Sequence, residues 1–191
     1  MAQTAEYVLE LGLDENVAPT SDGSYPLMQS VARREGPETW VPAWYTGFKP
    51  GDRVSFRFAD YTSASDDTPL VPVMVLISFR KPENPTQLSN PFKEKINPIS
   101  ILSSGFSLKS GKGSIILPAP LGSRVSYWYF VDSKGEEARF TFASAKLLKR
   151  FLLRLEIAVL HNDELRFYGH DPEIFVGEGG PPPGPPPRRR R

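Results

Sequence analysis

The chain has 191 residues, of which 39% are hydrophobic and 24% charged, a composition typical of one globular domain with tails. It contains no cysteine, which excludes disulfides and thiolate chemistry. The net charge is +1, but Arg188, Arg189, Arg190 and Arg191 contribute +4, so the rest of the chain carries −3.

The hydropathy of the chain gives no sign of a membrane protein. No apolar run approaches the ~20 residues that a membrane-spanning helix needs. The first residues, MAQTAEYVLELGLDEN, contain neither a basic leader region nor a long apolar segment. These features predict a cytoplasmic protein without a signal peptide or a membrane span.

Prolines divide the chain into short segments. Of the 20 prolines, six lie in the last residues and the others are spread through the body, where only 121–171 is long and proline-free. Proline interrupts helices and central strands, so short strands joined by turns are expected. The pattern predicts an all-β, mainly antiparallel fold, as a β-sandwich or jelly-roll-like single domain over residues 1–177.

Three strands are expected in the first half of the chain. Residues 6–13 are short and apolar-rich. Residues 52–58 (DRVSFRF) alternate apolar and polar side chains after a KPGD turn, which predicts a half-buried antiparallel strand. Residues 71–79 (VPVMVLISF) are apolar on both faces, which predicts a central strand covered on both sides. Polar segments at 19–39 and 81–98 are expected to be loops, the second either functional or poorly ordered.

The second half predicts further strands and one ambiguous segment. A short strand is expected at 114–118, and a hairpin is expected from 124–131 and 136–143 around Lys134-Gly135. In 144–164 the first leucines have helical spacing and the later ones alternate. We expect a strand over 151–160, with one preceding helical turn or a continuous amphipathic helix as alternatives. Two more strands are expected at about 165–169 and 172–176.

Two stretches resemble the bacterial inclusion-body protein family of the PixA/AidA type. In that family a GD turn leads into a strand of apolar and Arg residues, which is similar to PGDRVSFRF at 50–58. The family ends with a long apolar strand, a polar turn, an aromatic strand and a DP step, which is similar to 153–176. The resemblance implies a β-sandwich and a cytoplasmic, non-enzymatic protein that self-associates. It covers about 35 of the 191 residues, and it includes neither the N-terminal region nor the Pro/Arg tail.

No pattern in the chain indicates a catalytic or metal site. His161 and His170 each lie beside carboxylates, as metal ligands do. With a turn at Asn162-Asp163, however, His170 would lie opposite Leu155, about 20 Å from His161. Asp171 before Pro172 is typical of a turn, and the glycine- and lysine-containing loop at 104–114 lacks the phosphate-loop spacing. We therefore expect no enzymatic activity, metal or cofactor.

A cluster of aromatic residues supports a second functional hypothesis. Trp40, Trp44, Tyr45 and Phe48 lie in a proline-bounded stretch. Core packing is the default for such residues, and the alternative is an exposed contact for self-assembly or for a ligand ring. In the second case the protein would be a ligand-binding β-sandwich with an aromatic pocket around 40–48.

The C-terminal tail, GEGGPPPGPPPRRRR, is the most unusual stretch of the sequence. Residues 178–191 are expected to be disordered, and the prolines favour a polyproline II spacer that extends about 20 Å. Arg188, Arg189, Arg190 and Arg191 would then bind nucleic acid, an anionic lipid surface, another polyanion or the acidic body of a neighbouring copy. The alternatives are an SH3-type partner and a tail without function. The sequence thus predicts a self-associating homo-oligomer whose tail contacts polyanions or other copies.

Overall fold

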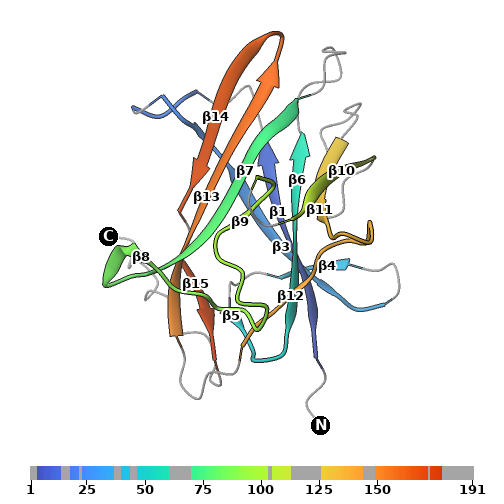
Figure 1. The fold of residues 1–191 in the computed structure, drawn as a ribbon, viewed down its shortest axis with the longest axis vertical. Helices are drawn as coiled ribbons and strands as arrows, with labels where there is room; N and C mark the ends of the chain where they lie inside the picture. Colours follow the sequence, from blue (N-terminus) through green and yellow to red (C-terminus); the bar gives the residue numbers. More distant parts are fainter. Residues whose placement is uncertain are drawn as a thin grey trace, which may run out of the picture.

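The computed structural model describes residues 4–13, 18–21, 23–36, 40–43, 47–60, 70–102, 105–112, 126–143, 149–171 and 173–177. In these ranges the chain forms strands and turns, and it contains no helix long and apolar enough to cross a membrane. The strands form two sheets, which confirms the all-β prediction and gives a β-sandwich-like architecture (Figure 1).

Sheet 1 is built around two adjacent parallel strands, β1 and β6. Its order is β10-β11-β6-β1-β3-β4, and β12 also pairs with β6. The β1–β6 pair is parallel and the other pairs are antiparallel. The strands are β1 (Glu6–Leu13), β3 (Met28–Arg34), β4 (Trp40–Ala43), β6 (Arg53–Asp60), β10 (Ser107–Lys112), β11 (Ser126–Val131) and β12 (Phe140–Thr141).

Sheet 2 is built around the long strand β13. Its order is β2-β14-β13-β15-β5, and β7 pairs with β13, β8 and β9. Only the two-residue strands β2 and β5 pair in parallel, with β14 and β15. The strands are β2 (Tyr25–Pro26), β5 (Gly47–Phe48), β7 (Val71–Lys81), β8 (Asn84–Leu88), β9 (Ile99–Ser100), β13 (Lys149–His161), β14 (Glu164–His170) and β15 (Glu173–Val176).

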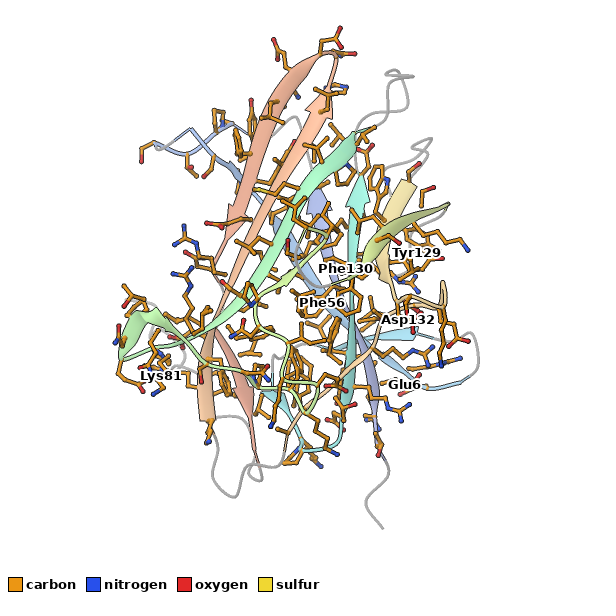
Figure 2. The ribbon with its side chains drawn as sticks, viewed as in Figure 1. Glu6, Phe56, Lys81, Tyr129, Phe130 and Asp132 are labelled. Carbon is orange, nitrogen blue, oxygen red and sulfur yellow. The ribbon has the colours of Figure 1, made fainter. Side chains whose placement is uncertain are left out.

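The core lies between the two sheets. Alternate residues of β1 and β6 face alternate residues of β7 and β13, as the two-residue period of a strand requires. Figure 2 shows Phe56 and Phe130 in this interior, with Tyr129 on the other side of its strand. Ring contacts continue through the core, and Phe92 lies within 4.9–5.4 Å of Phe79, Phe142 and Phe140 between ring centroids. Offset and edge-to-face contacts of this kind stabilise the core beyond the area that the rings bury.

Several predicted turns are confirmed. Asp52 donates its backbone N–H to the Lys49 carbonyl, and Gly51 has a φ of 91°, so KPGD is a tight turn that requires glycine. The Asn162-Asp163 turn joins β13 to β14, and both residues have a positive φ (49° and 62°), as a type I′ hairpin turn requires. The strand at 151–160 is confirmed as part of β13, which excludes a helix from residue 149 onward. Residues 144–148, where the helical turn was expected, lie outside the described residues.

The prediction for 52–58 was wrong in two respects. The strand β6 pairs in parallel with β1, although it also pairs in the expected antiparallel sense with β11 and β12. It is also buried on both faces, because the polar side chains of Ser55 and Arg57 are 4% and 9% exposed. Pairing along the strand edges does not by itself cover a face, but Glu137, Tyr127 and Tyr129 pack around Arg57 there, so this polar side chain has its partners within the protein.

The prediction for 71–79 was also wrong in part. β7 lies between β13 on one side and β8 and β9 on the other, and Val75, Ile77 and Phe79 belong to the core. Val71 and Val73, however, are 46% and 43% exposed. In the half of β7 that contains Val71 and Val73, the apolar run therefore has one face in the core and one face open to solvent.

Three segments that were expected to be loops contain strands, and one of them is also anchored to the core. Residues 28–34 form β3 and residues 107–112 form β10, so 19–39 and 104–114 are not loops throughout. The segment 81–98 contains β8 and is anchored to β7, where the Asn97 side chain both donates to and accepts from the Phe79 backbone at 2.9 and 3.0 Å. The segment also places Phe92 in the core, and this contact with the core explains why the segment is ordered.

The predicted hairpin at 124–143 is only partly formed. Its turn is present, with a bridge between Val131 and Glu137 and Gly135 at a φ of 81°. Beyond the turn the chain leaves β11, and Phe140 and Thr141 pair with the other end of β6. The strand expected at 114–118 lies outside the described residues.

Candidate functional site

The outer face of sheet 2 carries large apolar side chains that are open to solvent. Two rows of cross-strand neighbours lie there, Val71–Leu160–Leu165 and Met74–Ala158–Phe167. A register shift between Ala158 and Val159 places Val73 between these rows as a bulge. We call five exposed residues the apolar face, and their exposed fractions are 41–52%: Val71, Val73, Leu160, Leu165 and Phe167.

A hollow of about 660 Å³ adjoins the apolar face. Phe167 and Met74 line it together with Thr20 and Ser24, from the segment that leads into β2, and with Pro26 of β2. Gly169 also lines it, and a Cβ on this residue would meet only the Leu155 carbonyl oxygen, at 3.8 Å. The hollow therefore continues the apolar face toward the N-terminal segment.

An ion pair marks the polar border of this region. Arg154 and Glu156 both line the hollow, with the guanidinium Nη2 2.6 Å from Oε1 of the carboxylate. Glu164 and Arg166 form a second pair at 3.6 Å near the hairpin turn. The Arg154–Glu156 pair sums to zero charge, so this border of the apolar face carries no excess of either sign, whereas Glu164 and Arg166 project from the opposite face of β14.

The outer face of sheet 1 has the opposite character. Arg57 on β6 donates from Nε to Oε1 of Glu137 at 3.1 Å, and its Nη2 lies 3.0 Å from the same oxygen. The guanidinium carbon lies 4.9 Å from the ring centroid of Tyr127 and 5.9 Å from that of Tyr129. Glu10, the register neighbour of Arg57 on β1, is buried. These charges are held within the fold by partners of opposite charge and by aromatic faces.

A polar hollow of about 640 Å³ lies near the turn at 132–136. Its carboxylates include Glu94, which accepts a hydrogen bond from the Thr141 backbone, and Asp132, which accepts from the backbone of the turn. Both carboxylates therefore have structural roles. No group of three or more His, Cys, Asp or Glu residues within the described ranges is arranged to hold a metal ion.

The histidines lie where the turn geometry predicted. His170 pairs with Leu155 and His161 pairs with Glu164, so six residues of β13 separate the two positions along the sheet. His161 is buried next to the turn. Asp171 lies at the border of the hollow on sheet 2. The register separates the two histidines, as expected.

The aromatic cluster around 40–48 is only partly described. Phe48 is buried, its ring stacks on Phe142 at 4.6 Å, and it meets Tyr7 edge-on at 5.1 Å. Phe48 is therefore a core residue, which favours core packing over a surface contact at this position. The backbone of Trp40 forms the start of β4. Trp44, Tyr45 and the arginines 188–191 lie outside the described residues.

Sequence reasoning did not identify the apolar face as a site. One signal was the segment 71–79, which is apolar on both faces. A second was the pair Leu165 and Phe167, which project from the face of β14 opposite to the buried Tyr168. A strand that is apolar on both faces indicates either a covering layer or a binding surface, and only the structure distinguishes the two.

Comparison with known proteins does not assign a family to the chain. It matches no protein-family model, and a search of curated proteins finds no similar sequence. The resemblance to the inclusion-body protein family therefore stays a hypothesis.

Proposed function

We propose that this chain is a non-enzymatic protein that self-associates, and that a second copy of the chain covers the apolar face. The observation that carries the proposal is the exposure of five large apolar side chains on adjacent strands of one sheet. Contiguous apolar surface of this kind marks contact sites, because its removal from water is favourable.

A second copy is the partner that the charges favour. The ion pair Arg154–Glu156 lies on the same face of β13 as Leu160 and contains one charge of either sign. Two copies of this face can therefore approach each other with opposite charges in register and without net repulsion. An isologous contact of this kind is the commonest way in which soluble proteins form oligomers.

Mutation of leucines provides a direct test of the contact. The variant Leu160→Ser/Leu165→Ser removes two leucines from the apolar face of each copy, hence four per dimer. If the contact buries about half of each side chain, the loss is roughly 3 kcal/mol, which raises the dissociation constant about 100-fold. Light scattering coupled to size-exclusion chromatography over a concentration series measures this change.

The chain offers a matched control for this test. Leu88 and Leu102 are also exposed, at 45% and 77%, but they lie outside the apolar face. The variant Leu88→Ser/Leu102→Ser should associate like the unmodified protein. A monomeric unmodified protein at 100 µM, or equal effects of the two variants, would contradict the proposal.

The tail enters the proposal as a separate contact with polyanions or with neighbouring copies. Serine at all four positions 188–191 removes the +4 charge that the sequence concentrates there. If the tail binds nucleic acid, this variant should lose the associated absorbance at 260 nm, and salt should produce the same loss in the unmodified protein, with a slope of about −3 to −4 for four contacts. Association through the apolar face should persist at high salt in both proteins.

A further inference from the structure

The strand β14 has one paired edge and one largely open edge. On one side all of its residues pair with β13, from Glu164 opposite His161 to His170 opposite Leu155. On the other side, among the described strands, only Tyr168 and Gly169 have partners, in β2. Among the described residues, the stretch 164–166 therefore presents an open edge beside the apolar face, at the end of the hairpin that is uppermost in Figure 1.

The hairpin turn determines which backbone N–H and C=O groups point to this edge. A two-residue turn makes His161 and Glu164 the closing hydrogen-bonded pair, and the pairs then alternate along the hairpin. The N–H and C=O groups of Glu164 and Arg166 are therefore directed to β13, whereas those of Leu165 and Phe167 are directed outward. The parallel pairing of Tyr168 with Tyr25 takes up the Phe167 carbonyl, so within the described chain Leu165 is the residue that directs both its N–H and its C=O to an open edge, where another strand can pair.

We propose that β14 pairs antiparallel with β14 of a second copy, with Leu165 opposite Leu165 of that copy. In this register Glu164 of each copy lies opposite Arg166 of the other. Sheet 2 would then be continuous across the two copies, and the apolar faces would adjoin. This inference rests on the proposed self-association and adds an edge contact to it: the copy that pairs at β14 extends sheet 2, and a different copy covers the apolar face.

Two observations select this register. A shift that placed Arg166 opposite Arg166 would bring like charges together, which destabilises a strand pair. The same shift would place Glu164 beside Tyr168 of the other copy, where Tyr25 of β2 already occupies the edge. The proposed register uses only residues on the turn side of β2, and it pairs opposite charges on both sides of its centre.

The absence of cysteine makes the geometry directly measurable, because a single introduced cysteine is the only thiol in each copy. At a hydrogen-bonded antiparallel pair the Cα atoms are about 5.5 Å apart, within the range that a disulfide spans. The variant Leu165→Cys should therefore form a crosslinked dimer under mild oxidation. We expect its initial rate to be at least ~10-fold higher than that of the controls below.

Two neighbouring positions of the apolar face serve as controls. In the proposed register the two copies of residue 167 are offset by four residues, about 13 Å along the strands, and the two copies of residue 160 are three strand spacings apart, about 14 Å. Phe167→Cys and Leu160→Cys should therefore crosslink slowly. Equal or faster crosslinking at either position would overturn the edge pairing.

A charge exchange tests the register independently. Glu164→Arg places two cations opposite each other at both ends of the pair and should weaken dimerisation about 10-fold or more. The double variant Glu164→Arg/Arg166→Glu restores opposite charges and should recover affinity to within about three-fold of the unmodified protein. Failure of the double variant to recover would overturn the register.

The measurements separate this inference from the proposed function. Light scattering on each reduced cysteine variant reports association without reference to its geometry. If the variants associate but Leu165→Cys shows no preference, the edge pairing is wrong and self-association stands. If none associates and the unmodified protein is also monomeric, both proposals fail.

Discussion

On the outer face of sheet 1, charged side chains are buried, whereas on the outer face of sheet 2, large apolar side chains are exposed. Glu10 and Arg57 are 1% and 9% exposed on β1 and β6, but Leu165 and Phe167 are 52% and 50% exposed on β14. This is the reverse of the usual distribution, in which charged residues are rarely buried unless they are paired.

The two faces differ in whether their side chains have partners within the described chain. Arg57 has a carboxylate and two aromatic rings around its guanidinium, so its burial is compensated. The apolar side chains of β14 have no equivalent compensation, because removal from water requires a cover. The comparison therefore indicates a stabilising role for the outer face of sheet 1 and supports the proposal that another molecule contacts the outer face of sheet 2.

The largest expected effect is on sheet 1. Replacement Arg57→Ala removes the cation that pairs with Glu137, with the two side chains only 11% and 19% exposed. The loss of a mostly buried partner should lower the free energy of unfolding by about 3 kcal/mol. Urea denaturation, read as a change in midpoint at constant slope, measures the effect.

Arg154 is the matched residue on sheet 2. Its pair with Glu156 is more exposed, at 44% and 33%, so Arg154→Ala should change the free energy of unfolding by less than about 1 kcal/mol. If the two arginine variants were equally destabilised, the division of roles between the faces would be wrong.

Two glycines give a sterically matched comparison with a smaller effect. A Cβ on Gly111 of β10 would overlap the Tyr127 ring, which must then shift from its place beside Arg57. Gly169 of β14 has open space. Gly111→Ala should therefore destabilise the protein by about 1–2 kcal/mol, since overpacking forces a side chain from its position.

The second glycine completes this test. Gly169→Ala should leave the free energy of unfolding within about 0.5 kcal/mol, because its new methyl group enters the hollow. Thermal or urea unfolding of both variants distinguishes them. Equal destabilisation of the two would show that the space at residue 169 is not available in solution.

The sequence predicted those parts of the fold that have local signals. The Asn162-Asp163 turn and the alternation on both sides of it determine the β13–β14 hairpin, including the pairing of His170 with Leu155. The KPGD turn places glycine where a positive φ is needed. Local turn chemistry and the two-residue period were sufficient in both places.

Other elements depend on contacts that have no local signal. The pairing of Tyr25 and Pro26 with β14 is two residues long and joins segments more than 140 positions apart. Strand β3 lies in a polar segment and is stabilised by six register partners on β1. In such segments tertiary pairing outweighs propensity, which sequence reasoning does not capture.

From the sequence, the candidate site was predictable only as one of two alternatives, a covered or an open apolar face. The apolar character of both faces of 71–79 is visible in the sequence, but whether the second face is covered depends on packing. The burial of Arg57 was hidden for the same reason, because the alternation of 52–58 is equally typical of a half-exposed strand. Exposure is a property of the assembled sheets rather than of a single strand.

The smallest effect concerns the rim of sheet 1 and depends on pH. Glu6 lies 2.8 Å from Arg34, 3.4 Å from Arg139 and 3.9 Å from Arg53. Hydrogen bonding from Arg34, with the nearby positive charges, lowers the pKa of Glu6 despite its partial burial. A lowered folded-state pKa means that the native state favours the ionised carboxylate, so Glu6 stabilises the fold above its unfolded pKa of about 4.3.

This contribution should be lost as the pH falls from about 4.3 through the lower folded-state pKa. At pH 7 we expect Glu6→Gln to cost about 1 kcal/mol, the usual scale for a hydrogen bond to a charged group, and the difference from the unmodified protein should shrink toward zero in acid. Urea denaturation across pH 2–7 measures it, with the exposed Glu35→Gln as control. A constant difference at all pH values would assign the effect to packing and not to charge. Association through sheet 2 should be the same for Glu6→Gln and for the unmodified protein at every pH at which both remain folded, so a lower oligomer content of the variant would break the separation between the two faces.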